Sequence, residues 1–119
     1  MSKVDLLFGN ELPAGFVYPD QFGRIIDLGI LDLEPWYMLQ GDILREVNKG
    51  LRTRYPQRSL VPFARRQDND DTACWDAAEP GRVVVIHDFA SSGWEQRAAY
   101  GDFYQWLRQA IEDLIEFDS

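Results

Sequence analysis

The stretch that decides the fold is DTACWDAAEPGRVVVIHDF, residues 71–89. Its second half, RVVVIHDF (82–89), is a continuous run rich in β-branched residues, which favours a strand buried in the middle of a sheet. DTACW (71–75) is a shorter strand candidate, and AAEPG (77–81) between them contains turn formers. Two strands joined by a short turn pair side by side in opposite directions. We therefore expect an antiparallel hairpin at the centre of the fold.

Two further extended segments precede this hairpin. SLVPFA (59–64) is apolar, but Pro62 cannot donate a hydrogen bond to a neighbouring strand, so we expect it at an edge or an irregularity. LDLEPW (31–36) is extended because Pro35 disfavours a helical conformation at the residue before it. After the hairpin, ASSGWEQ (90–96) reads as a loop.

Three helices are expected around these strands. Asp20 is a possible N-cap for a short helix, residues 42–54 have helical periodicity and end before Pro56, and a third helix begins at Gly101 or Asp102. The apolar stripe of the third helix is formed by Phe103, Trp106, Leu107, Ala110, Ile111 and Leu114. Helices flanking a run of antiparallel strands indicate an α+β fold. We expect one domain over residues 1–119, with a central, largely antiparallel sheet and helices packed on it.

The charge of the chain is large and unevenly distributed. The net charge is −8, which argues against general nucleic-acid binding because phosphate contacts need clustered lysines and arginines. Basic residues are concentrated between 45 and 66, where only Glu46 is acidic. The rest of the chain is strongly acidic and would attract a basic partner surface, although solubility alone is the alternative explanation.

Cysteine content and hydropathy bear on the compartment. Cys74 is the single cysteine, so no internal disulfide can form and an oxidising compartment is not required. The first fifteen residues have no apolar run typical of a signal peptide, and no stretch approaches the roughly 20 apolar residues of a membrane helix. We expect a cytoplasmic protein that has no membrane partner.

The acidic stretch RRQDNDDTACWD (65–76) can first be compared with a calcium-binding loop. Counted from Asp68, positions 1, 3, 5, 9 and 12 of an EF-hand loop are Asp68, Asp70, Thr72, Asp76 and Glu79. However, Ala73 occupies the position where the loop needs glycine, and strand candidates flank the segment where the motif requires helices. We therefore predict no metal site here.

A catalytic interpretation of residues 68–88 is the second possibility. His87 is the only histidine, which excludes a metal site built on several histidines, whereas a Cys74–His87 pair or a Ser–His87–Asp88 arrangement stays open. The roles of an active site cannot be assembled from these residues, and a lone cysteine on a strand is more often a small core residue. We predict no catalytic residue and no cofactor, with a small metal-dependent or Cys/His enzyme as the alternative.

A protein-binding surface is the third possibility. Trp94 is a residue type favoured at the centre of interfaces, and neighbouring carboxylates would speed the docking of a basic partner. The predicted partner-binding residues are Asp68, Asp70, Asp71, Asp76, Trp94 and Glu95. Trp75 is either part of this surface or part of the core.

The order of these segments resembles that of the SUKH superfamily, also called Smi/Knr-like domains. The resemblance rests on ELP near the N-terminus, LVPFA, the acidic turn leading to CWD, the next strand, and the closing FYQWL helix. The family includes proteins similar to a fungal cell-wall regulator and many bacterial immunity proteins of polymorphic toxin systems. The resemblance implies an α+β domain that binds a protein, often a nuclease or another toxin domain, without catalysis or cofactor.

The function expected from this resemblance is that of an immunity protein. It would neutralise a polymorphic toxin by direct binding, and its partner would be a basic toxin domain. A regulatory interaction scaffold without a toxin partner is the alternative.

Overall fold

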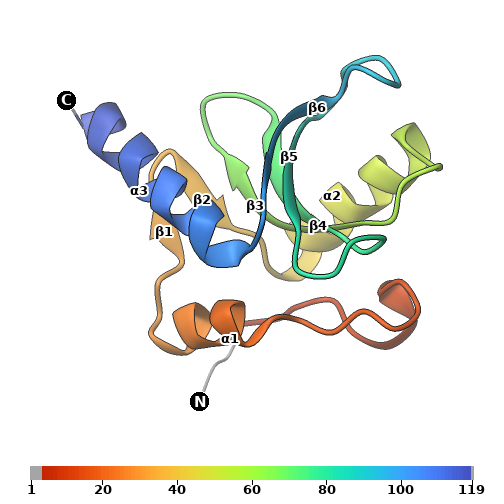
Figure 1. The fold of residues 1–119 in the computed structure, drawn as a ribbon, viewed down its shortest axis with the longest axis horizontal. Coiled ribbons are helices and arrows are strands. Elements are labelled where there is room, and N and C mark those ends of the chain that lie inside the picture. The colour runs from red at the N-terminus through yellow and green to blue at the C-terminus, as the bar shows by residue number, and fades with distance from the viewer. Residues whose placement is uncertain (1–3, 119) are drawn as a thin grey trace.

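An antiparallel sheet of six strands is the centre of the structure, a computed structural model that describes residues 4–118. The strands follow one another across the sheet in chain order, and each pairs antiparallel with the next. They are β1 (Asp32–Leu33), β2 (Trp36–Met38), β3 (Leu60–Arg66), β4 (Asp71–Asp76), β5 (Val83–His87) and β6 (Gln96–Tyr100). With the helices packed on this sheet (Figure 1), the chain has the α+β fold expected from its sequence.

The predicted central hairpin is confirmed as the pair β4–β5. Trp75 lies opposite Val83 next to the turn, and Asp71 lies opposite His87 at the other end of the ladder. Gly81 closes the turn with a φ of +83°, a conformation that is strained for residues with a Cβ atom. Because β5 is paired with β4 on one side and with β6 on the other, its valines and isoleucine are buried.

Pro62 lies inside β3, at an irregularity of the sheet. The register of the β3–β4 pair shifts between Pro62 and Ala64. The neighbouring strand β2 pairs only with Ala64–Arg66, so Pro62 lies beyond its end. The missing N–H of Pro62 therefore falls where the regular ladder is already interrupted.

The segment around Pro35 is a small hairpin rather than one extended stretch. β1 and β2 flank the Glu34–Pro35 bond, which is cis.

The sequence analysis did not predict β6 at all, because QRAAY has little β-branched character and its side chains are mostly exposed or half-buried. As the last strand of the sheet, β6 is held by backbone pairing with β5.

Three α-helices and one short 3₁₀ helix complete the described part of the chain. They are α1 (Asp20–Asp27), α2 (Gly41–Arg54), α3 (Phe103–Asp118) and η1 (Gly9–Glu11). The predicted start of α3 is confirmed, since the Asp102 carboxylate accepts a 2.9 Å hydrogen bond from the backbone N–H of Gln105. The predicted cap of α1 is wrong: Pro19 occupies the cap position, and Asp20 is the first helical residue.

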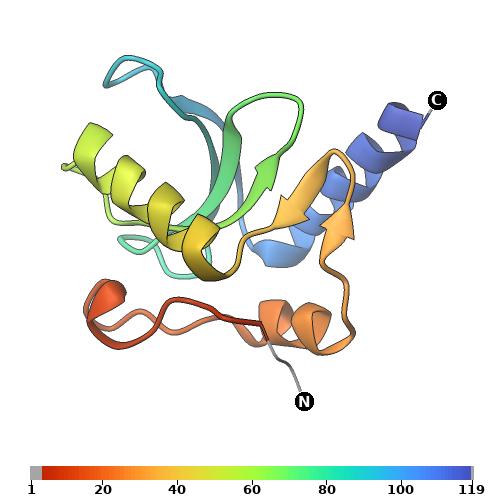
Figure 2. The same ribbon diagram turned by 180° about the vertical axis from the view of Figure 1, so that it is seen from behind.

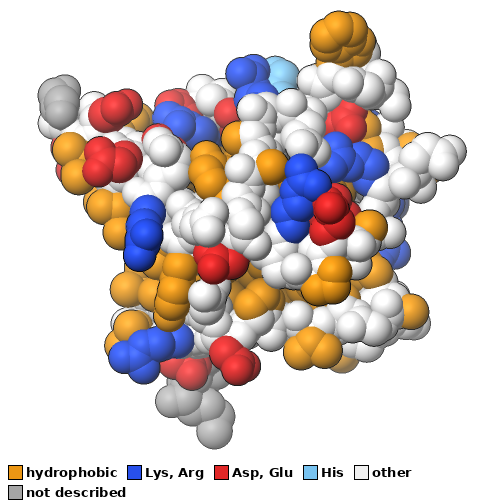
Figure 3. All heavy atoms as spheres, viewed as in Figure 1, with side chains coloured by type: hydrophobic (Ala, Val, Ile, Leu, Met, Phe, Trp, Pro, Cys, Tyr) orange, Lys and Arg blue, Asp and Glu red, His pale blue; other side chains and the backbone are white. Residues whose placement is uncertain are grey.

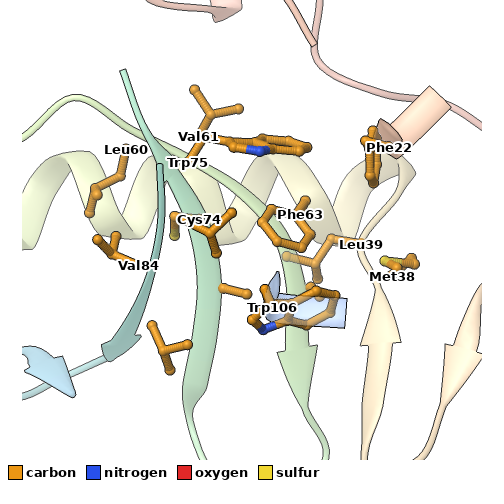
Figure 4. Packing of buried hydrophobic residues seen from close by; sticks show 14 of the residues in the cluster. Phe22, Met38, Leu39, Leu60, Val61, Phe63, Cys74, Trp75, Val84 and Trp106 are labelled. Atoms are coloured by element: carbon orange, nitrogen blue, oxygen red, sulfur yellow. The ribbon is translucent and has the colours of Figure 1, made fainter. Parts of the chain in front are cut away.

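The helices cover the two faces of the sheet. Figures 1 and 2 show α2 on one side of the strands and α3, with α1, on the other. Trp75 faces α1 and α3 and lies against Phe22 and Phe103, with ring centroids 4.9 Å and 6.3 Å away. Phe63 lies between Trp75 and Trp106 (Figure 4), at 4.4 Å and 4.9 Å. Trp75, which the sequence left either in the binding surface or in the core, is therefore a core residue.

The stripe of α3 gives a test of this packing. Trp106 is 1% exposed and also meets Trp36 edge to face, so the variant Trp106→Ala should lower the free energy of unfolding by about 3–5 kcal/mol. Urea denaturation followed by circular dichroism measures this loss. Ile111 was expected on the same apolar stripe, but this is wrong, since it is 42% exposed. The control Ile111→Ala should therefore cost less than about 1 kcal/mol. Equal losses in the two variants would contradict the orientation of α3.

Candidate functional site

The acidic turn and the loop that carries Trp94 lie together at one end of the sheet. The β4–β5 register places Asp71 opposite His87. Consequently the acidic turn (residues 67–71), which leads into β4, lies beside the loop after β5, residues 88–95, which we call the aromatic loop. The backbone N–H of Asp88 donates to the carbonyl of Asp70 at 3.2 Å, which joins the two segments.

Asp88 connects this pair of segments to the rest of the fold. Its carboxylate is fully buried and receives two 2.7 Å hydrogen bonds from the guanidinium of Arg54, at the end of α2. Arg65, near the end of β3, reaches the same carboxylate at 3.5 Å and Asp70 at 3.2 Å. A bidentate arginine–carboxylate pair has both high strength and a fixed geometry. Asp88 therefore holds a helix, a strand and the acidic turn at the start of the aromatic loop.

Glu95 fixes the other end of the aromatic loop. It is 7% exposed, accepts a 2.8 Å hydrogen bond from Arg58, and accepts another of 2.6 Å from the backbone N–H of Gly93. Burial by itself raises the pKa of Glu95, but Arg58 and the backbone N–H groups of Gly93 and Glu95 outweigh it and leave the pKa below its ordinary value. Glu95 is thus a buried anchor of the loop, not the exposed partner contact that we expected.

The predicted acidic residues are all paired with basic side chains. Arg66 binds Asp68 through two hydrogen bonds of 2.8 and 2.9 Å and thereby lowers the pKa of Asp68. Asp71 lies 3.0 Å from both His87 Nδ1 and Arg97 Nε. The remaining pairs are Asp70 with Arg65 and Asp76 with Arg58, the latter at 4.0 Å. The acidic turn is exposed at residues 67–70, but its carboxylates all have basic partners, so it is not a free negative surface. Asp76 lies at the other end of β4, opposite Leu60.

Two aromatic side chains of the loop are exposed. Trp94 is 82% exposed and Phe89 is 62% exposed. Phe89 has a φ of 70°, which is rare for a bulky residue, and its ring lies 4.0 Å from the guanidinium carbon of Arg54. The loop projects at the top right of Figure 1, and Figure 3 shows a large hydrophobic side chain standing out from the surface there.

The middle of the aromatic loop is also fixed. The hydroxyl of Tyr55, just after α2, donates a 2.8 Å hydrogen bond to the carbonyl of Ala90. The backbone N–H of Trp94 donates to the carbonyl of Ser91 at 2.9 Å. The exposed aromatic rings therefore stand on a loop that is bonded to the body of the protein at its start, middle and end.

Cys74 and His87 are not brought together, and the Ser–His87–Asp88 arrangement is not formed either, since His87 is bonded to Asp71 and the carboxylate of Asp88 to Arg54. Cys74 is fully buried, which raises the pKa of its thiol and keeps it protonated. It pairs with Val84, three steps along the ladder from His87, a distance of roughly 10 Å. Cys74 is a core residue, as interpreted from the sequence, and His87 is directed to Asp71.

The calcium-loop alternative does not match the backbone. Half of the twelve positions counted from Asp68 belong to β4 and its pairing with β3 and β5, so they cannot wrap around an ion. Within residues 4–118, no group of three or more histidine, cysteine, aspartate and glutamate side chains is placed to hold a metal.

Comparisons with family models, with curated proteins and with solved structures found no match for this chain. Among the described helices, none has the length and apolar character needed to cross a membrane. The site is therefore interpreted from its own geometry.

Several residues of this site were missed by the sequence analysis. Phe89 was included in a strand, and the pairing of Arg54 and Arg65 with Asp88 was not anticipated. The sequence does concentrate arginines before β4 and carboxylates after β3. Which arginine pairs with which carboxylate, however, depends on the register of the sheet.

The buried pair of Asp88 and Arg54 should contribute strongly to stability. We expect Asp88→Asn to lower the free energy of unfolding by about 3 kcal/mol. This is the lower end of the range for a buried pair, because the Arg54 side chain is 29% exposed. The control Asp68→Asn removes a pair whose carboxylate is 39% exposed and should cost at most about 1 kcal/mol. Urea denaturation of both variants measures the two losses of unfolding free energy. Equal losses would contradict the stronger contribution of the buried Asp88–Arg54 pair.

The lowered pKa of Glu95 predicts a pH dependence. A carboxyl whose pKa is lower in the folded state stabilises the fold above its unfolded pKa of about 4.3. That contribution is lost as the pH falls through the folded pKa. The difference in unfolding free energy between wild type and Glu95→Gln should therefore be constant from pH 6 to 7 and shrink below about pH 4. A difference that stays constant down to pH 3 would show that the charge of Glu95 does not act in this way.

Proposed function

We propose that this chain is a protein-binding domain of SUKH type without catalytic activity, and that it is an immunity protein of the cytoplasm. It would neutralise a polymorphic toxin by direct contact through the aromatic loop. The observation that carries this proposal is the exposure of Phe89 and Trp94 on a loop held at both ends by buried carboxylates.

An exposed tryptophan on a fixed loop has the properties of an interface anchor. Binding energy is concentrated in a few residues, and tryptophan is enriched among them. A loop already held in one conformation loses little entropy when a partner binds, so more of the contact energy appears as affinity. Trp94, with Phe89 exposed on the same loop, can insert into an apolar pocket of the partner.

The charge of the protein supports a basic partner. The net charge of −8 attracts a positively charged protein over a distance, and nuclease toxins are commonly basic around their active sites. The carboxylates of the site itself are paired with arginines, so the contact at the aromatic loop would be mainly apolar. The segments that resemble the SUKH superfamily correspond to β3, β4, β5 and α3, and they support the family assignment through the order of elements.

The burial and placement of Cys74 and His87 support a function without catalysis. Cys74 is buried and protonated, and it pairs with Val84, three positions along β5 from His87. Neither is placed to act with the other on a substrate.

Co-expression tests this proposal. The toxic domain encoded beside the gene should arrest bacterial growth when expressed alone, and this chain should restore growth and bind the domain in calorimetry. The variant Trp94→Ala should weaken binding about 30-fold, as expected for a hot-spot loss of about 2 kcal/mol, and should reduce protection. The control Leu28→Ala changes a residue that is 60% exposed at the end of α1, distant from the loop, and should leave both unchanged.

Two outcomes would contradict the proposal. A neighbouring gene without a toxic product would favour the regulatory scaffold. Full protection by Trp94→Ala would show that the aromatic loop is not the contact surface.

A further inference from the structure

A groove lies between the β1–β2 hairpin and the start of α2. It has a volume of about 260 Å³. Leu31, Asp32 and Tyr37 line it from the side of the hairpin, and Ile43 lines it from α2. Ile43 is 58% exposed, so this apolar wall is open to solvent. No lysine or arginine of the described chain is among the lining residues.

Asp32 and Tyr37 reach the groove from neighbouring strands. They lie directly opposite each other in the β1–β2 ladder. Residues opposite each other in an antiparallel pair have their side chains on the same face, with Cβ atoms about 4.5–5.5 Å apart. Asp32 is exposed and Tyr37 is half-buried. The groove therefore presents a carboxylate and an aromatic ring side by side.

The negative charge at this groove is not neutralised within the fold. Asp32 has no ion-pair partner among residues 4–118, and the same is true of Asp42 and Glu46, near the start of α2. Glu46 is three positions after Ile43, so the two side chains are neighbours on the helix surface. The groove thus combines an apolar wall with uncompensated carboxylates.

Arg65 is next to Tyr37 on the side away from Asp32, since the two residues are paired in the β2–β3 ladder. Its guanidinium is already bonded to Asp70 and Asp88, at 3.2 and 3.5 Å. The charge of Arg65 is therefore balanced by those carboxylates and does not compensate Asp32.

The same fold shows what such a pair of groups holds. At the aromatic loop, the guanidinium carbon of Arg54 lies 4.0 Å from the centre of the Phe89 ring, and its nitrogens bond to Asp88. An arginine there satisfies an aromatic ring and a carboxylate at once. Tyr37 and Asp32 offer the same two groups, but within residues 4–118 no cation lies over the ring of Tyr37.

We propose that this groove binds an arginine side chain of a partner protein. The aliphatic part of the arginine would lie against Ile43 and Leu31. Its guanidinium would lie on the ring of Tyr37 and bond to Asp32. A planar guanidinium stacks on aromatic rings and forms two parallel hydrogen bonds with a carboxylate, whereas the ammonium of lysine is a point charge.

Charge and ligand number disfavour other occupants. A second copy of the chain has the same net charge of −8 and would be repelled over a distance. Anionic lipid attracts basic segments and would repel these carboxylates as well. Calcium takes about six to eight oxygen ligands, whereas Asp32 is the only carboxylate among the described residues that line the groove.

This groove is separate from the aromatic loop. In Figure 1 the β1–β2 hairpin lies on the left, and the loop between β5 and β6 projects at the top right. The inference concerns a second contact surface and goes beyond the proposed function. It can therefore be tested without the toxin.

The probe is the peptide acetyl-glycyl-arginyl-glycine amide, titrated into the isotope-labelled protein and followed by NMR. The amide signals of Asp32, Tyr37 and Ile43 should shift and saturate with a Kd of about 1 mM, since a ligand of this size makes few contacts. The control peptide has citrulline in place of arginine, which keeps the planar shape and removes the charge. It should bind at least about tenfold more weakly, because hydrogen bonds to an ionised donor are the stronger ones.

Variants then locate the site. Asp32→Asn and Tyr37→Leu should each weaken binding of the arginine peptide at least about fivefold. The matched control Glu34→Gln removes an exposed carboxylate of the same hairpin that does not line the groove, and it should leave binding unchanged. Circular dichroism confirms that each variant is folded.

Three outcomes would overturn the inference: no saturating shift in the wild type, equal binding of the citrulline peptide, or equal effects of Asp32→Asn and Glu34→Gln. The last of these would show a general attraction of cations instead of a site. None of them bears on the aromatic loop, whose role is tested by Trp94→Ala with the toxin.

Discussion

The carboxylate of Asp88 has no exposed surface and lies where three parts of the fold meet. Arg54 approaches it from α2, Arg65 approaches it from β3, and the backbone of Asp88 bonds to the acidic turn. A buried carboxylate without partners costs several kcal/mol, so these elements must stay together once Asp88 is folded inside. The same residue begins the aromatic loop, and the Asp88 carboxylate accepts a 2.9 Å hydrogen bond from the N–H of Phe89.

The distribution of charge follows from this arrangement. Two of the arginines between residues 45 and 66 pair with carboxylates that are distant in sequence: Arg45 pairs with Asp5 and Glu11, and Arg58 pairs with Glu95. These pairs tie the N-terminal segment and the aromatic loop to α2 and β3. The excess negative charge is consequently found on segments that the arginines do not reach, such as the end of α3. The aromatic loop itself exposes apolar side chains beside carboxylates that are balanced in charge by arginines.

The sequence predicted those elements that are specified by residues close to one another in the chain. The β-branched run 82–89 predicted a central strand, and the helical spacing of Phe103, Trp106 and Ala110 predicted the buried face of α3. It also identified Trp94 as a candidate contact, and the structure places this residue on the surface.

What could not be predicted depends on register and on distant partners. β6 lacks a β-branched pattern and exists because β5 offers a free edge. Glu95 looks like a surface residue until Arg58 is brought beside it. The acidic turn reads as a free negative patch because nothing local shows that Arg65 and Arg66, a few residues earlier, turn back to neutralise it.

The central claim is that Asp88 holds the aromatic loop in the conformation that exposes Phe89 and Trp94. Amide hydrogen exchange measured by NMR tests this claim most directly. In the wild type, the N–H groups of Phe89 and Gly93, which donate to the carboxylates of Asp88 and Glu95, should exchange much more slowly than in an unfolded chain. In Asp88→Asn the N–H groups of Phe89 and Gly93 should lose most of this protection. The buried amides of Val84 and Val85 in β5 should still exchange as slowly as the global unfolding free energy of the variant allows. Fast exchange of these loop amides in the wild type, or protection unchanged by Asp88→Asn, would contradict the account.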